Sequence, residues 1–293
     1  MSAYFVAPIP WLDVMRRTVK EIEDDNCLGM AAQLAFYFLL ALFPALLFGV
    51  ALIGFVPVED AVRELLTALG AVAPQEIIVI LRAQVAQIAE GSHGSLLTLG
   101  IGGAIWSSSA AMVAIIDALN RAYDVVEWRP WWKRRVVAVS LTVALAVFII
   151  GALTLVLIGP TLASRVADWL GLEPVVALMW ALIRWPVMIF FVVLGVDLIY
   201  YFAPNKSGRW AWITPGSMLA TTLWIISSFA FKLYVTNFSD YTATYGAIGG
   251  VIVTMLWFYV SSMAILIGAE LNAVVEEAWR RLEDDRRSIA AGH

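Results

Sequence analysis

The sequence predicts an all-α membrane protein with six transmembrane helices, an N-terminal amphipathic helix and an outer helical hairpin between spans one and two. Composition is the first observation behind this prediction. Of the 293 residues, 61% are apolar and 14% are charged, whereas soluble domains carry about 25% charged residues. The second observation is a set of long apolar windows that reach the roughly 20 residues of a membrane span. These windows run approximately over 29–56, 95–118, 136–163, 177–203, 213–236 and 246–274.

The apolar windows are expected to be helices, because backbone groups in lipid must form hydrogen bonds within their own segment. A transmembrane β-barrel would instead show short segments of alternating hydrophobicity. The continuous apolar run over 136–158 does not alternate. The sequence therefore predicts a six-helix transmembrane domain over 29–276, followed by a cytosolic tail over 277–293.

Residues 1–28 are expected to form a cytosolic segment that contains the amphipathic helix. Arg16, Arg17 and Lys20 lie between apolar residues that recur at helical spacing. This pattern is typical of a helix that lies on the membrane surface. The alternative is a cap helix that packs beneath the bundle. The apolar residues are Trp11, Leu12, Met15, Val19 and Ile22.

The segment 57–94 is less apolar than the windows on either side of it. Two apolar stripes, around Leu65 and around Leu81, are separated by Gly70 and Pro74. Glycine and proline interrupt helices. The segment therefore predicts a helical hairpin, which would cap the bundle from outside.

The basic residues predict the orientation in the membrane. Most of the 19 lysines and arginines lie in the N-terminal segment, in the loops after spans two and four, and in the C-terminal tail. Short loops rich in lysine and arginine stay in the cytosol. Both termini are therefore expected to be cytosolic.

Several short segments of the sequence are more specific indicators of a protein family than the hydropathy is. They are Ala35–Pro44, Trp106–Ser109 with Ala118–Tyr123, Asp197–Asn205, Tyr245–Gly250, and Leu256–Tyr259 with Gly268–Asn272. Together they resemble the YihY/BrkB family of bacterial inner-membrane proteins, formerly labelled ribonuclease BN, over about residues 20–277. The resemblance implies a six-helix fold in the bacterial cytoplasmic (inner) membrane, and it implies no settled activity.

Three acids in the predicted spans are candidates for function, because an ionisable group inside a bilayer costs at least a few kcal/mol. Asp117, Asp197 and Glu270 lie in the inner thirds of spans two, four and six. We expect them to converge on the cytosolic side. They would form either a polar cavity for a cation, a proton or a polar head group, or a structural cluster of ion pairs and helix caps. The candidate substrate- or ion-binding residues are Asp117, Asn120, Arg121, Asp197, Tyr200, Tyr201, Asn205, Glu270 and Asn272.

Asp197 is the leading candidate in this set. Span four carries no other charge from Val187 to Phe202. A protonated carboxyl is buried at low cost, whereas an ionised one needs a partner. Asp197 is therefore predicted to be a proton-coupling site. For Asp117, the expected countercharge is Arg121, one helical turn further along the chain.

Small residues in spans two and six predict close helix packing. Gly246 and Gly250 form a GxxxG step in span six, and Gly103 and Ser107 begin a small-residue ridge on span two. A conduit lined by glycine carbonyls is the alternative.

Several classes of function are disfavoured. The net charge of −4 argues against a nucleic-acid partner, because phosphate binding needs a concentrated cationic patch. One cysteine and two distant histidines give no basis for a metal site, a cofactor or a nucleophile–histidine pair. A ribonuclease would also need its acid, base and cations in water.

The sequence therefore predicts a non-enzymatic membrane protein that transports a small solute or a lipid through a cytosol-facing polar cavity. The alternative is a non-transporting membrane scaffold or envelope-maintenance protein. Membrane lipids are the expected partners. The small-residue ridges could pack within one bundle or between two copies of the chain, so a homo-oligomer is the second possibility for them.

Overall fold

The computed structural model describes residues 8–53, 94–170, 173–206, 211–237 and 240–291. Within these ranges the chain forms helices and no strands, which confirms the all-α class. The predicted hairpin over 57–94 lies outside the described residues, except for its last residue. The helices are α1 (Trp11–Asp24), α2 (Cys27–Ile53), α5 (Gly94–Ala122), α6 (Trp131–Leu170), α7 (Glu173–Phe202), α8 (Pro215–Asn237) and α9 (Asp240–Ala291).

Each predicted window falls on a separate helix, in order from α2 to α9. Among the described residues, four helices are long and apolar enough to cross a membrane, and the bent pair α1–α2 makes a fifth when it counts as one span. The membrane class is therefore confirmed, and the number of six spans stays a prediction. The four segments are Trp131–Ala152, Leu182–Phe202, Pro215–Val235 and Gly249–Ile289.

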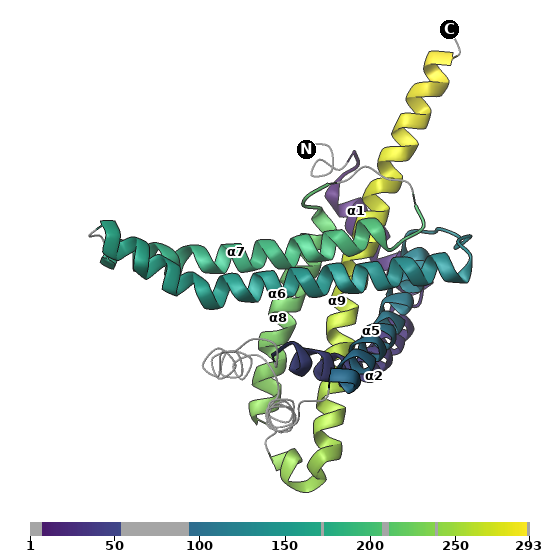
Figure 1. Cartoon of the computed structure of the whole chain (residues 1–293). Coiled ribbons are helices and arrows are strands. Elements are labelled where there is room, and N and C mark those ends of the chain that lie inside the picture. The colour runs from purple at the N-terminus through teal and green to yellow at the C-terminus, as the bar shows by residue number, and fades with distance from the viewer. Residues whose placement is uncertain (1–7, 54–93, 171–172, 207–210, 238–239, 292–293) are drawn as a thin grey trace.

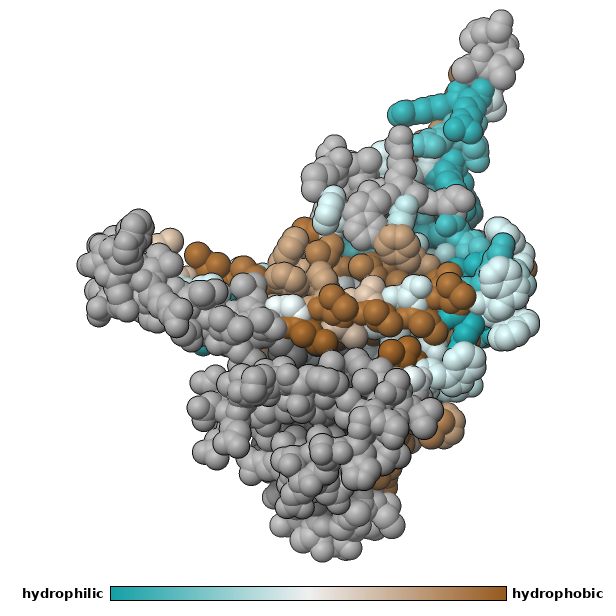
Figure 2. All heavy atoms as spheres, in the orientation of Figure 1, coloured by the Kyte–Doolittle hydropathy of each residue, from teal (hydrophilic) through white to brown (hydrophobic). Residues whose placement is uncertain are grey.

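The helices form two sets in space. Figure 1 shows α2, α5, α8 and α9 grouped together, with the α6–α7 hairpin crossing them. Helix α2 packs on α5 and α9, helix α8 packs on α9, and the hairpin joins this group through α5–α6 and α7–α8 contacts. The C-terminal end of α9 extends beyond the other helices, and Figure 2 shows that this end is hydrophilic.

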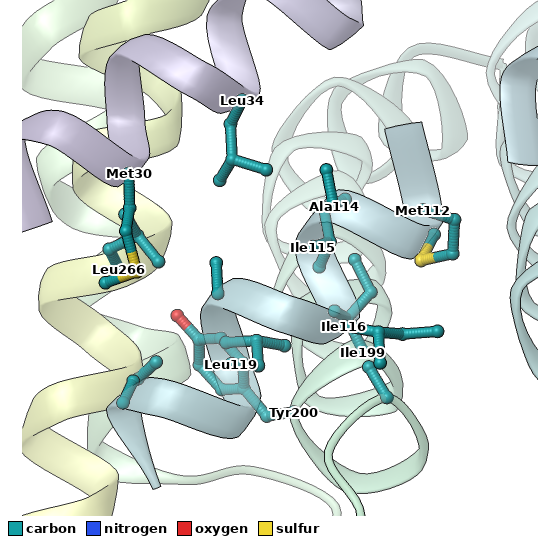
Figure 3. Close-up of a cluster of buried hydrophobic side chains, with 14 of the residues drawn as sticks. Met30, Leu34, Met112, Ala114, Ile115, Ile116, Leu119, Ile199, Tyr200 and Leu266 are labelled. Carbon is teal, nitrogen blue, oxygen red and sulfur yellow. The ribbon is translucent and has the colours of Figure 1, made fainter. Parts of the chain in front are cut away.

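The main apolar core forms where α2, α5, α7 and α9 meet. Leu34 of α2, Ile116 and Leu119 of α5, and Leu266 of α9 are almost completely buried. Figure 3 shows these side chains in one cluster, with Leu119 beside Tyr200 of α7. Inside a bilayer, close packing contributes more to such a core than the exclusion of water does. This core fixes the C-terminal end of α7 and the middle of α9, which carry polar residues described below.

Helix α1 packs against α9 with one face. Val14 is fully buried among Leu271, Val274 and Val275 of α9. Thr18 is buried beside Val14 and donates its hydroxyl hydrogen bond to the Val14 carbonyl (2.9 Å). The cap-helix alternative therefore holds for this face, while a second group of apolar residues on α1 stays exposed.

A sharp bend connects α1 to α2. The two helices meet at 63° across Asp25 and Asn26. Asn26 has φ of 53°, in the left-handed region that asparagine adopts more readily than most residues. The Asn26 side chain also caps α2, because its Oδ1 accepts a hydrogen bond from the Gly29 amide (3.3 Å). One residue thus both turns the chain and starts the next helix.

Candidate functional site

The buried carboxyl and amide side chains lie at one end of the bundle, which we call the polar end. It comprises the C-terminal parts of α1, α5 and α7, the start of α2 and of α8, the loops over 123–130 and 203–206, and residues 268–276 of α9. Hydrogen bonds link these segments to one another across the chain. Three groups of residues within it can be told apart by their partners.

The first group, the polar junction, joins α7, α8 and α9 through Asp197, Thr214, Ser217 and Asn272. The Asp197 carboxylate accepts hydrogen bonds from the hydroxyls of Thr214 (2.5 Å) and Ser217 (2.7 Å). Asn272 donates to the Thr214 hydroxyl (2.8 Å) and accepts from the Gly216 amide (2.8 Å). Asp197 is only 2% exposed, so a complete set of donors offsets the cost of burying its carboxyl.

The polar junction is built on the N-terminus of α8. Thr214 precedes Pro215, which opens the helix, and the Thr214 hydroxyl accepts from the Ser217 amide (3.2 Å) as an N-cap does. Asp197 lies against these first residues of α8, where the helix dipole favours a negative charge. Its donors and its position therefore give Asp197 a structural role at the start of α8.

A glycine contact brings α8 and α9 together beside the junction. A Cβ atom built on Gly268 would lie 2.6 Å from the Tyr200 hydroxyl and 2.7 Å from the Ala220 Cβ, and would overlap the Gly216 carbonyl. Gly216 and Gly268 thus allow the two helix backbones to touch, as small residues do in membrane proteins. The predicted packing residues were Gly103, Ser107, Gly246 and Gly250, and the surroundings of Gly103 and Gly246 lie outside the described side chains.

The two tyrosines that follow Asp197 both make contacts within the protein. The buried Tyr200 donates its hydroxyl hydrogen bond to the Ile265 carbonyl of α9 (2.5 Å). The Tyr201 ring packs edge-on against Phe202, with ring centroids 4.8 Å apart. Both therefore contribute to the packing of α7.

The second group, the acidic corner, lies around Glu270 and includes Cys27, Asp25, Glu21 and Asp124. Glu270 is 1% exposed, and the Cys27 thiol donates to its Oε1 (3.3 Å). The Asp25 carboxyl lies near Glu270, and Glu21 and Asp124 add negative charge. Burial, followed by the charges of Asp124 and Glu21, raises the pKa of Asp25. Within the described part of the chain, Glu270 forms no ion pair with a lysine or an arginine.

Asp117 belongs to neither group. Its carboxylate pairs with Arg134 of α6 (2.7 Å), and its side chain is about half exposed. The prediction that Arg121 is the countercharge of Asp117 is wrong, because α6 folds back along α5 and supplies a closer arginine. The structure therefore distributes the three acids over three separate sets of partners.

The third group, the loop clamp, ties the loop after α5 to the end of α7. Asn120 donates to Glu127 (2.8 Å) and accepts from the Asn205 amide (2.7 Å). Arg129 binds Glu127 and donates to the Ala203 carbonyl (2.9 Å). Burial alone would raise the pKa of Glu127, but the hydrogen bonds from Arg129 and Asn120 outweigh it and lower that pKa. Asn120 and Asn205 thus hold loops together.

The loop clamp continues into an ion pair that the sequence did not predict. Lys206 pairs with Glu276 of α9 (2.7 Å), and both side chains are mostly buried. The Lys206 Nζ lies 3.4 Å from the centroid of the Tyr123 ring. Burial lowers the pKa of Lys206, and the Glu276 charge opposes that shift. In the sequence, Lys206 looks like one of many basic loop residues, and nothing links it to Glu276, 70 positions away.

Replacing Glu276 with glutamine is expected to destabilise the protein, because it leaves the Lys206 ammonium buried without a countercharge. Breaking a buried pair costs about 3–5 kcal/mol. The control is Glu277→Gln, which removes an exposed pair with Arg281 and should cost less than about 1 kcal/mol. Thermal melting of the detergent-purified variants measures both. Equal melting temperatures for the two variants would contradict the assigned burial of the pair.

Comparison with known proteins gives a consistent result over most of the chain. The family model described as virulence factor BrkB matches residues 18–291. The putative ribonuclease-like protein YfkH of Bacillus subtilis is 36% identical over 255 residues, which cover 87% of this chain and 92% of YfkH. The UPF0761 membrane protein of Pseudoalteromonas translucida is 25% identical over 272 residues, covering 90% of this chain and 85% of that protein.

A third relative is longer than this chain. The UPF0761 membrane protein of Nitrosospira multiformis is 26% identical over 276 residues, which cover 92% of this chain and 62% of that protein. No solved structure matches the chain.

Proposed function

Because the chain belongs to the virulence factor BrkB family of membrane proteins, we propose that it transports a small solute or a lipid across the bacterial cytoplasmic membrane. We assign to Glu270, in the acidic corner, the gain and loss of a proton or a cationic group during transport. The distribution of lysine and arginine supports a cytosolic location for the polar end and for both termini.

The burial of Glu270 without an ion-pair partner among the described residues carries this proposal. A carboxylate that is removed from water needs a cation or several strong donors. Glu270 has a thiol, which is a weak donor, and neighbouring carboxyls that repel a negative charge. The positive charge of Arg121 acts on the adjacent Asp25 and Cys27. This carboxyl is stable in the closed bundle only when it carries a proton or binds a cationic group, so it can exchange either with the cytosol.

The position of Glu270 between two helices supports a role in opening. Cys27 is the first residue of α2, and it follows the bend that joins α1 to α2. The contact between α2 and α9 at this point includes the hydrogen bond from Cys27 to Glu270. Ionisation of Glu270 would place a buried negative charge near Asp25 and Glu21, a repulsion that the thiol hydrogen bond does not cancel, and movement of α2 away from α9 would expose the carboxyl to water and to the cargo.

Asp197, the leading candidate from the sequence, is less suited to this step. Its carboxylate already has two hydroxyl donors and lies at the start of α8. Releasing it would leave the Thr214 and Ser217 hydroxyls without that acceptor. We therefore assign Asp197 to positioning α8, and Glu270 to exchange with the cytosol.

We infer no ribonuclease activity, although the name of the relative YfkH includes the word ribonuclease-like. Phosphodiester cleavage needs an acid, a base and phosphate-binding cations that water can reach. Asp197 and Glu270 are buried in the polar end, and Arg129 and Lys206 are committed to Glu127 and Glu276.

Native mass spectrometry of the purified protein tests the role of Glu270. The wild type and the exposed control Glu277→Gln are expected to retain a lipid or small-molecule adduct. Glu270→Gln should lose it by about tenfold or more, because a charged hydrogen bond contributes about 1.5–3 kcal/mol. An identical adduct on all three proteins, or none on any of them, would argue against Glu270 as the exchanging group and favour a scaffold.

A further inference from the structure

Helix α1 carries two apolar faces, and the structure accounts for only one of them. Val14 and Thr18 are buried against α9. Trp11, Met15 and Val19, which follow one another at about one turn, are 45%, 48% and 56% exposed. Leu12 widens this second stripe and is 63% exposed. The contact with α9 prevents α1 from rotating to bury the stripe.

The position of α1 relative to α2 indicates what covers the stripe. Helix α2 is apolar along its length and meets α1 at 63° after only two residues. A helix that leaves a span at this angle is directed away from the membrane normal and towards the lipid surface. Leu28, in the first turn of α2, and Phe36, two turns further on, are also exposed, so the lipid-facing surface begins directly after the bend.

The chemistry of the stripe fits the boundary between head groups and acyl chains. Tryptophan is enriched at that boundary, because its ring is apolar and its N–H is polar. The stripe contains no charged residue, whereas Lys20 and Asp24 pair with each other in water on α1. A second copy of the chain is a poorer fit, because a stable interface needs about 800 Å² from each partner, more than four side chains supply.

We propose that the stripe formed by Trp11, Leu12, Met15 and Val19 is a membrane-docking surface that inserts into the leaflet at the polar end. Because the adjacent face of α1, with Val14, packs on α9, this insertion would hold α9 at a fixed height relative to the lipid surface. The docking surface does not depend on the role of Glu270, so either proposal can fail without the other.

Spin labels on single cysteines introduced by Leu12→Cys and Met15→Cys test the proposal in full-length protein, in nanodiscs of phosphatidylethanolamine and phosphatidylglycerol. Arg17→Cys and Lys20→Cys are the matched controls on the polar side of α1. The native Cys27 is fully buried. Labelling of the wild type measures any background signal from this cysteine. Power saturation measures access of oxygen, which concentrates in lipid, and of a nickel chelate, which stays in water.

Labels at positions 12 and 15 are expected to be more accessible to oxygen than to the nickel chelate, with the reverse order at positions 17 and 20. Nickel access at positions 12 and 15 equal to that of the controls would place the stripe in water and overturn the proposal. Exclusion of both reagents at positions 12 and 15 would also overturn it, because a protein surface would then cover the stripe. Labels are placed at two positions of the stripe. If one cysteine variant folds poorly, the other variant still tests the proposal.

Discussion

Gly268→Ala is expected to disrupt the packing of α8 on α9 and to destabilise the protein strongly for a change that adds a single methyl group. The new Cβ would overlap the Gly216 carbonyl and press on the Tyr200 hydroxyl and on Ala220. Backbone atoms cannot move aside as a flexible side chain can. Overpacking costs about 1–3 kcal/mol and occasionally more, and we expect at least about 3 kcal/mol here. Thermal melting monitored by size-exclusion fluorescence measures the loss.

Two other glycines provide controls with the opposite expected sign. Nothing lies within 4 Å of a Cβ built on Gly102 or Gly151. Alanine favours a helix over glycine by about 0.5–1 kcal/mol, so Gly102→Ala and Gly151→Ala should melt at the wild-type temperature or slightly above it. Loss of stability in all three variants would show that the contact between Gly216 and Gly268 is not special.

Asp197→Ala is expected to be the most damaging substitution in the polar junction. It removes the shared acceptor of the Thr214 and Ser217 hydroxyls and the negative charge at the start of α8. Hydrogen bonds to a charged group contribute about 1.5–3 kcal/mol each, so a loss of about 3 kcal/mol or more is expected in thermal melting. Asp197→Asn keeps one acceptor oxygen and should lose about half as much.

The matched control is Asp117→Asn, which alters a half-exposed acid whose partner is Arg134. Exposed ion pairs contribute about 0–1 kcal/mol, so this variant should melt close to the wild type. If Asp197→Asn melts like Asp117→Asn, the structural role of Asp197 is wrong, and its role as a proton-coupling site, predicted from the sequence, becomes the better explanation.

The helices of the fold could be predicted because long apolar runs leave few alternatives in lipid. The full length of α9 could not be predicted. A hydropathy window ends where charged residues begin, near residue 274, yet the helix continues through the charged segment to Ala291. The paired charges of that segment, such as Glu277 with Arg281 four positions later, favour a helix in water. The tail predicted over 277–293 is thus largely the end of α9.

The candidate acids could be predicted from their cost in a membrane, but their partners could not. The spacing rule behind Arg121 considers only residues on the same helix, whereas Arg134 comes from the next one. Thr214 and Ser217 are ordinary polar residues in the sequence, although threonine directly before proline is a recognisable helix start. The Gly216–Gly268 contact needs the register of two helices, which a single sequence does not contain.

The length and the two-sided arrangement of α9 have a mechanical consequence. Its 52 residues make a rod of about 78 Å, more than twice the roughly 30 Å hydrocarbon core. Gly268 and Asn272 contact α8 on one side of this rod, and Glu270 contacts α2 on the other. A small rotation of α9 about its own axis therefore shifts the contacts on both sides at once and in opposite directions, so a torque applied to the aqueous end would disturb the α8 contact and the α2 contact together.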